Sequence, residues 1–174
     1  MAIYHCSIQP ISRSDGRSIV ACAAYRAGEK LECDTYGKTQ DYTRKTGIEY
    51  KQIFAPVGAS PDLLDRQTLW NQVEQSELKK DGSIKQEARL AKEVEVALPH
   101  ELDKAQRQAL VTELCQSLVK GHGVAVDVAI HAPHIAGGSD DRNFHAHILM
   151  TTRTATGQGL GGKVRELDRH STLK

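Results

Sequence analysis

The sequence predicts an α+β domain with a central, largely antiparallel β-sheet and helices packed on one face of it. Residues 92–99, 124–131 and 143–152 alternate between apolar residues and polar or small ones, as strands do. Residues 59–78 and 101–120 instead carry apolar residues near helical spacing. The order strand, helix, helix, strand, helix, strand, strand along the chain favours this class.

The first half of the chain is expected to begin with a strand over residues 2–11, which enters a turn at SRSDGR. A helix follows in SIVACAAYRAGEKL, because the stretch is rich in alanine, opens on Ser18 as N-cap and has no breaker before Gly28. Residues 32–51 are expected to form a loop with short strand pieces around DYTRK and EYKQIF. KDGS ends the helix over residues 59–78, and IKQEARLA then returns to helical character.

In the second half, Pro99 closes the strand KEVEVALP. The helix over residues 101–120 is expected to end at Gly121. Its apolar stripe consists of Leu110, Leu114 and Leu118. The strand GVAVDVAIHA, the loop APHIAGGSDDR and the strand NFHAHILMTT follow. Beyond Thr152 the composition shifts to Gly, Thr, Lys and Arg, and no further core element is expected.

The composition indicates one globular domain in the cytoplasm. At 174 residues the chain is long enough for one substantial core. It has no apolar run of about 18 residues that would span a membrane, and its N-terminus does not resemble a secretory signal. Its four cysteines lack CxxC spacing, which favours free thiols in a reducing compartment. The formal charge of +1 argues weakly against broad, sequence-independent DNA binding but permits a local basic patch.

The three alternating strands have two chemically different faces. Because successive side chains on a strand point to opposite sides, one face collects branched apolar residues that can meet the helices. The other face is small or polar. Ala125 and Ala129 are expected to leave volume above it. Its titratable residues include Glu93, Glu95, His131, His145 and His147.

The histidines of this second face form a candidate metal site. The Cα atoms of His145 and His147 are about 7 Å apart at the usual strand rise, so their rings can tilt toward a common ion. His131 can join them if its strand pairs antiparallel with residues 144–151. Three neutral imidazoles leave coordination positions open on a divalent ion, as a catalytic site requires. The HxH pair alone is equally compatible with histidines that are merely hydrogen-bonded on a half-exposed strand.

A candidate nucleophile lies on the alanine-rich helix. Tyr25 is the only aromatic residue in SIVACAAYRAGEKL, and Arg26 follows it. A lone tyrosine on a helix is ordinarily a core or boundary residue, so it does not by itself indicate catalysis. A metal with nearby carboxylates would also permit hydrolysis by metal-bound water.

Taken together, these motifs resemble the N-terminal relaxase domain of the MobA/MobL type, within the HUH endonucleases that nick and rejoin single-stranded DNA. The resemblance covers most of the chain and rests, in family order, on AIYHCSIQPISRSDGRSIVACAAYRAG, LWNQVE, KEVEVALP, AIHAPH and NFHAHILMTTR. It implies an HUH relaxase-like fold, related to the ferredoxin and RRM folds. The chain departs from the family in its longer loop APHIAGGSDDRNFHAH and in Phe144, which stands where relatives have a proline.

The resemblance also assigns roles to residues. Tyr25 corresponds to the nucleophile, and Glu93 to an acid that orients a ligand histidine or accepts the tyrosine proton. Glu95 is a possible accessory acid. The implied ligands of one divalent ion, Mn2+ or Mg2+, are His131, His145 and His147. The candidates for phosphate contacts are Arg13, Arg17 and Arg26.

The implied function is that of a plasmid mobilisation or conjugation relaxase. It would nick single-stranded origin-of-transfer DNA at one site by tyrosine transesterification, leaving a 5′-phosphotyrosyl link and a free 3′-hydroxyl that can rejoin the strand. The implied partners are that DNA, accessory relaxosome proteins and a coupling protein, without membrane insertion. Residues 1–174 are expected to form one relaxase domain at the N-terminus of a longer protein. The alternatives are a metal-dependent hydrolase and a non-catalytic module that binds origin DNA.

Overall fold

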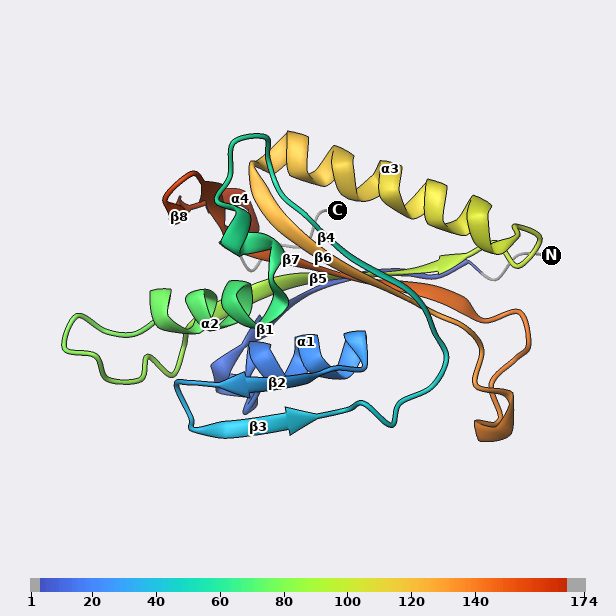
Figure 1. Cartoon of the computed structure of the whole chain (residues 1–174), viewed down its shortest axis with the longest axis horizontal. Coiled ribbons are helices and arrows are strands. Elements are labelled where there is room, and N and C mark those ends of the chain that lie inside the picture. Colours follow the sequence, from blue (N-terminus) through green and yellow to red (C-terminus); the bar gives the residue numbers. More distant parts are fainter. Residues whose placement is uncertain (1–3, 169–174) are drawn as a thin grey trace.

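The chain is built around a six-stranded antiparallel sheet in a computed structural model that describes residues 4–168 (Figure 1). The strand order is β1-β5-β7-β6-β4, and β8 pairs with the far end of β7. The bounds are β1 Cys6–Ser12, β4 Ile48–Phe54, β5 Arg89–Leu98, β6 Val124–His131, β7 Phe144–Thr156 and β8 Gly159–Lys163. The predicted α+β class and antiparallel sheet are therefore confirmed, while residues 2 and 3 of the first predicted strand lie outside the described residues.

Helices cover both faces of the sheet, not one face as the sequence suggested (Figure 1). The helices α1 (Ile19–Ala27) and α2 (Arg66–Ser76) lie on one face. On the opposite face lie α3 (Lys104–His122) and the short α4 (Arg165–Asp168). Each face carries enough apolar surface for its own core, and burying both removes more apolar area from water than burying one.

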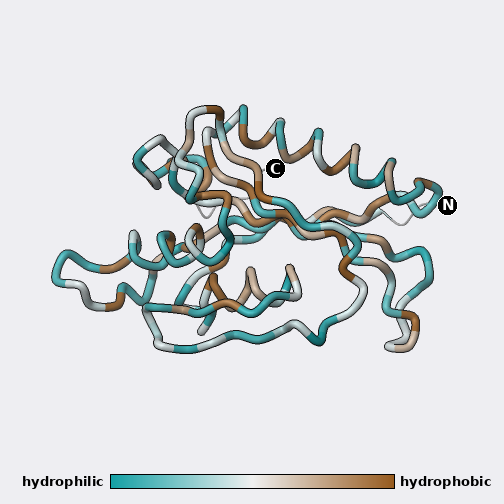
Figure 2. Tube along the Cα trace, in the orientation of Figure 1, coloured by the Kyte–Doolittle hydropathy of each residue, from teal (hydrophilic) through white to brown (hydrophobic). Residues whose placement is uncertain are grey.

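The two cores place different sheet residues under their helices. Valines and isoleucines of β6 and β7 pack under α3, with Val111, Cys115 and Val119 of that helix. Under α1 the sheet instead offers Ala91, Ala125 and Leu149. Figure 2 shows the hydrophobic strands at the centre and α3 alternating between hydrophilic and hydrophobic residues above them. Small side chains on the sheet let the alanine-rich α1 approach closely, so the volume expected above Ala125 is filled by protein.

The local signals for α1 and α2 work as predicted, with one refinement. The Ser18 hydroxyl accepts a hydrogen bond from the Ala21 amide at the start of α1, and Gly28 ends the helix at φ +61°. A Cβ on Gly28 would lie 2.3 Å from Ile48 Cδ1, the flexible end of that side chain, so the left-handed backbone is the main reason for glycine at this position. The helix predicted over residues 59–78 is divided into the 3-10 helix η2 (Pro61–Leu64) and α2.

The predicted apolar stripe of α3 was wrong for two of its three leucines. Leu110 and Leu114 are 45% and 36% exposed, while Leu118 is partly buried against the core. The fully buried line of the helix begins one position after Leu110 and contains Val111, Cys115 and Val119. One position along a helix corresponds to a rotation of about 100°. The apolar, valine-rich face of the sheet therefore packs against the side of α3 that carries Val111 and Cys115. The helix also continues past Gly121 to His122 and ends at Gly123 in a left-handed conformation.

Three other segments complete the described fold. A two-stranded sheet, β2 (Lys30–Cys33) and β3 (Lys38–Asp41), lies beside α1, and the short 3-10 helices η1 (Arg13–Asp15) and η3 (Ile135–Gly137) lie in connections. IKQEARLA is not helical: it crosses a single bridge and enters β5 at Arg89. The chain after Thr152 does add to the core. Strand β7 extends to Thr156 and is followed by β8, and Val164 and Leu167 are buried.

No helix in the described range 4–168 is long and apolar enough to cross a membrane. The four cysteines are free thiols, as predicted.

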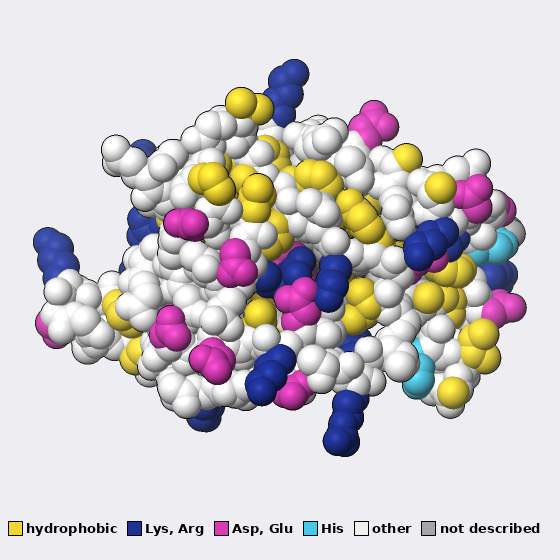
Figure 3. Space-filling model, in the orientation of Figure 1, with side chains coloured by type: hydrophobic (Ala, Val, Ile, Leu, Met, Phe, Trp, Pro, Cys, Tyr) yellow, Lys and Arg dark blue, Asp and Glu magenta, His cyan; other side chains and the backbone are white. Residues whose placement is uncertain are grey.

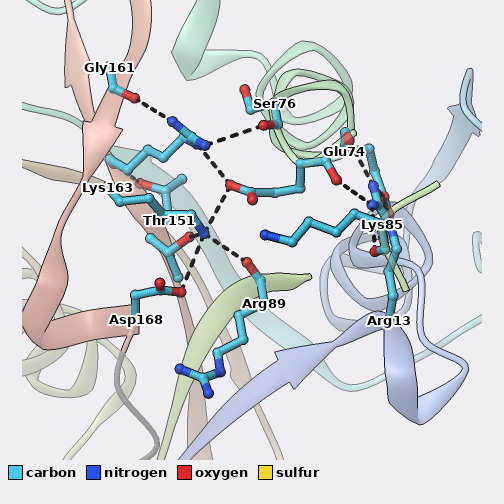
Figure 4. A network of polar contacts seen from close by, with 12 residues as sticks. Arg13, Glu74, Ser76, Lys85, Arg89, Thr151, Gly161, Lys163 and Asp168 are labelled. Atoms are coloured by element: carbon cyan, nitrogen blue, oxygen red, sulfur yellow. Dashed lines mark hydrogen bonds and ion pairs between the residues drawn. The ribbon is translucent and has the colours of Figure 1, made fainter. Parts of the chain in front are cut away.

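Arg13 lies in a buried ion network rather than on a DNA-binding surface (Figure 4). Its guanidinium donates to the Glu74 carboxylate at 2.7 Å and to the carbonyl oxygens of Glu74 and Glu77. The other carboxylate oxygen of Glu74 accepts from the Ile19 amide at 2.9 Å, at the positive end of the α1 dipole. Beside it, Glu77 pairs with Arg153 and Lys163.

The expectation that Arg13 contacts phosphate is therefore corrected. The side chain is 1% exposed and its donors face protein oxygens. Its role is to neutralise Glu74, which joins α2 to the start of α1.

Replacing Arg13 with Gln should lower the free energy of unfolding by about 3–5 kcal/mol, because it leaves the buried Glu74 carboxylate without its cation. Urea denaturation followed by circular dichroism measures the loss. The matched control is Arg142→Gln, because Arg142 pairs with Asp140 in an exposed ion pair and its loss should hardly move the urea midpoint. Equal midpoint shifts in the two variants would contradict the structural role given to Arg13.

Candidate functional site

Three histidines converge where β6 ends and β7 begins. His131 lies directly opposite His145 in the antiparallel register, and His147 is the next residue of β7 on the same face. The pairing of His131 that the sequence analysis required is thus present. The ring centroids of the three imidazoles are 4.7 to 5.3 Å apart. One nitrogen from each ring lies within 4.8 Å of the others, a spacing at which they could hold one metal ion.

Carbonyl oxygens next to two of the rings determine which nitrogen carries the proton. His131 Nε2–H donates to the Arg26 carbonyl at 2.7 Å, and His145 Nδ1–H donates to the Asn143 carbonyl at 3.2 Å. Because these oxygens only accept, the second nitrogen of His131 and of His145 keeps its lone pair. His147 Nδ1 is buried and lies 3.4 Å from a carboxylate oxygen of Glu93 without a close hydrogen bond, and such outer contacts are typical of metal-binding histidines.

Two of the imidazoles, those of His131 and His145, are held in the neutral form that a cation needs. Burial lowers the pKa of His131 to about 3, and the positive charge of Lys45 acts in the same direction. Burial also lowers the pKa of His145. At neutral pH both rings therefore offer lone pairs without having to release a proton first. The donor set fits a divalent cation with open coordination positions.

Glu93 is held as a charged carboxylate by two partners. Arg26 of α1 donates to it through both Nε and Nη2, and His147 lies on its other side. Burial by itself would raise the pKa of Glu93, but His147 and Arg26 together lower it to about 2. Such a weak base is poorly suited to take a proton from a phenol. Of the two roles considered for Glu93, its contacts support orienting His147.

Tyr25 lies on the exposed side of α1, next to the residue that holds His131. Its side chain is 49% exposed, and the following residue, Arg26, supplies the carbonyl that His131 contacts. The Tyr42 ring meets the Tyr25 ring edge-on at 5.3 Å between centroids. Lys45 Nζ lies 3.5 Å from the centroid of the Tyr25 ring. The helix thus brings an accessible phenol to the end of the sheet that carries the histidines.

The remaining predicted site residues have different surroundings. Arg26 is occupied by Glu93 and Arg13 by Glu74, so neither guanidinium is free for phosphate. Arg17 is half-buried and has no recorded hydrogen bond or ion pair among the described residues, so it stays a candidate. Glu95 pairs with His147 in the β5–β7 register, and its charge favours the protonated form of His145.

Three residues that contact this site were not among the predicted site residues. Tyr42 and Lys45 lie in DYTRK, which was predicted to be a short strand piece, but β3 ends at Asp41 and these residues form a turn. Nothing in the pattern of this segment indicated contact with Tyr25. Asn143 contributes only a backbone carbonyl, which no side-chain pattern can reveal. Contacts of this kind depend on how a loop folds back, and periodicity carries no information about that.

The surface around the fold is mixed in charge. On the face in Figure 3, acidic and basic side chains are interspersed, in keeping with the formal charge of +1. A polar pocket of about 420 Å³ lies between α2 and the β7–β8 turn, and none of its lining residues belongs to the histidine cluster. Bulk electrostatic attraction is therefore not the feature that distinguishes the site.

Known proteins that resemble this chain include mobilization and conjugal transfer proteins. The chain is 38% identical to "Mobilization protein MobL" of Acidithiobacillus ferridurans, over 97% of this chain and 47% of that protein. It is 33% identical to "Conjugal transfer protein TraA" of Agrobacterium fabrum, over 94% of this chain and 14% of that protein. The chain therefore spans about half the length of the first relative and a small part of the second.

A solved structure from work on the "Molecular Basis of Vancomycin Resistance Transfer in Staphylococcus aureus" has the same fold. It superposes with a TM-score of 0.81 at 27% identity, over 99% of this chain and 84% of that one. The match to the MobA/MobL family extends over residues 17–173, which include Tyr25 and the three histidines. The chain belongs to the MobA/MobL family.

Proposed function

We propose that this chain is the relaxase domain of a plasmid mobilisation or conjugation protein, which nicks single-stranded origin-of-transfer DNA by tyrosine transesterification. The names of its relatives, mobilization and conjugal transfer proteins, support the general role. The observation that carries the chemistry is the adjacency of Tyr25 to the histidine cluster, since the residue after this exposed phenol holds His131 through its carbonyl.

The three histidines would hold one divalent cation, Mn2+ or Mg2+. When bound, the cation supplies positive charge to a non-bridging oxygen of the scissile phosphodiester and to the charge that develops at phosphorus. The chain's own part is to present the nitrogens of three imidazoles in a fixed orientation. Arg26, Asn143 and Glu93 contribute that orientation through oxygen atoms on the far side of each ring.

Tyr25 is the proposed nucleophile. A bond forms between its phenolic oxygen and phosphorus while the bond from phosphorus to the 3′ oxygen breaks. The products are a 5′-phosphotyrosyl link and a 3′-hydroxyl, and the phenolic proton ends, through solvent, on the departing 3′ oxygen. Because one phosphodiester replaces another, the 3′-hydroxyl can attack the link and restore the strand.

The acids and arginines of the site divide into orienting and substrate-facing groups. Glu93 and Arg26 fix the ring of His147 and the position of α1. Arg17 is the remaining arginine candidate for a phosphate contact, and Glu95 is a candidate accessory acid beside the histidines. Accessory relaxosome proteins and a coupling protein are proposed partners, and the cytoplasm, where free thiols stay reduced, is the proposed location.

Replacing Tyr25 with Phe should abolish both strand cleavage and the covalent protein–DNA adduct, because the attacking oxygen is lost. Labelled oligonucleotides that span candidate origins, incubated with Mn2+ and run on denaturing gels, measure both. The matched control is Tyr36→Phe, since Tyr36 is also exposed but lies at the β2–β3 turn. Cleavage that survives in Tyr25→Phe would favour a hydrolase that uses metal-bound water. Binding without cleavage by the unmodified protein would favour a non-catalytic origin-binding module.

Replacing Glu93 with Gln should weaken Mn2+ binding by roughly 10- to 100-fold, because His147 loses the carboxylate beside its Nδ1. Replacing His147 with Ala should weaken binding more, since a ligand itself is lost. Isothermal titration calorimetry on the metal-free protein measures both affinities without DNA. His134→Ala is the control, because His134 is exposed in the loop and lies outside the cluster. If all three variants bind Mn2+ equally well, the cluster does not hold the ion.

A further inference from the structure

The segment between β3 and β4 is fixed against both α1 and the histidine-bearing strand. The Tyr42 amide donates to the Glu29 carbonyl just beyond α1, and the Lys45 amide donates to the Tyr42 carbonyl in a tight turn. At the other end, the Ala132 amide donates to the Gly47 carbonyl just after β6. The turn that carries Lys45 is therefore tied to the two elements that supply Tyr25 and His131.

Lys45 uses this turn to lie across Tyr25. Its Nζ donates to the Tyr25 carbonyl at 3.0 Å and lies 3.5 Å from the centre of the Tyr25 ring. Tyr42 meets the same ring edge-on, with 89° between the planes. An ammonium group and an aromatic neighbour thus limit how the phenol can rotate, although its side chain remains half exposed.

The charges around Lys45 do not explain its position as an ordinary ion pair. Among the described residues no carboxylate pairs with it, and the charged group that acts on it most directly is the cation of Arg26. Burial, followed by Arg26, lowers the pKa of Lys45 to about 8. The other titratable groups that feel its charge are His131 and His145, whose rings are neutral. Its favourable partners are therefore the carbonyl and the ring of Tyr25.

We propose that Lys45 is a positioning residue that holds the Tyr25 ring and stabilises the negative charge that develops on it during attack. This inference rests on the proposed nicking function. A cation attracts the face of a neutral ring, and it attracts the ring more strongly as the phenol becomes phenolate. That increase is realised in the transition state, so it accelerates the reaction rather than binding alone. Nζ lies over the ring and not beside the hydroxyl, so Lys45 acts through Tyr25 and does not itself take the proton.

The competing role for Lys45 is a simple contact to DNA phosphate. A phosphate contact contributes to affinity and to its salt dependence, because each neutralised phosphate releases counterions. A positioning residue instead changes the rate of the bound complex. The two roles therefore predict losses in different measured quantities.

The experiment compares Lys45→Met, Lys45→Arg and the control Arg44→Met. Arg44 is the exposed neighbour, with no recorded hydrogen bond or ion pair in the range 4–168. A labelled single-stranded oligonucleotide from the origin of the replicon that encodes the chain is cleaved with Mn2+ at saturating protein. The single-turnover rate is measured, and the Kd is measured at several salt concentrations. Lys45→Met is expected to slow cleavage about ten-fold or more with unchanged Kd and salt slope. Lys45→Arg should recover most of the rate, and Arg44→Met should keep it.

A full cleavage rate in Lys45→Met, or a loss confined to Kd with a shallower salt slope, would overturn the proposal. Failure of the nicking function itself would look different, because the unmodified protein would then form no adduct. Nuclear magnetic resonance without DNA or metal tests the contact independently. The Lys45 ε-methylene protons should be shifted upfield by the Tyr25 ring and return to ordinary positions in Tyr25→Leu. Ordinary positions in the unmodified protein would also overturn the proposal.

Discussion

The arrangement of the site depends on how Arg26 fastens α1 to the sheet. Its side chain forms a bidentate ion pair with Glu93 of β5, and its carbonyl accepts a hydrogen bond from His131 of β6. Glu93 in turn lies beside His147 of β7. A buried ion pair gives little net stability because both charges lose water. Its two hydrogen bonds nevertheless fix the relative orientation of the two side chains. One residue therefore sets the helix that carries Tyr25 at a fixed position relative to β5, β6 and β7.

The two faces of the sheet carry different side chains, and this difference allows Arg26 to reach both Glu93 and His131. The valine-rich face is covered by α3, whereas α1 and α2 pack on the other face, which has alanines at Ala91 and Ala125. In the antiparallel register His147 lies opposite Ala129, and the His131–His145 pair follows at the end of that face, next to the end of α1. A face lined by larger side chains would hold α1 farther away, and the Arg26 carbonyl would not reach His131.

Buried carboxylates also link α2 to the sheet and to α1. Asp127 of β6 accepts from Arg66 and from the Trp70 indole, which ties α2 to the middle of the sheet. Glu74 joins α2 to the start of α1 through Arg13 and the Ile19 amide. Each buried carboxylate thus has its cation and its hydrogen bonds, the condition under which a charge can remain inside a protein. Arginines that resemble phosphate ligands in the sequence become internal cross-links.

The sequence by itself determined the strands β1, β5, β6 and β7, the caps of α1 and the face on which the histidines lie, because side-chain alternation and capping are local properties. It also carried the family resemblance that marked Tyr25 and the histidines. It did not determine which side of α3 is buried or that helices cover both faces of the sheet. It also did not determine that Arg13 pairs with Glu74 and Arg26 with Glu93. Those outcomes depend on contacts between residues far apart in the chain, and periodicity contains no record of such partners. Only the packed structure decided that a lysine from a loop lies across the phenol.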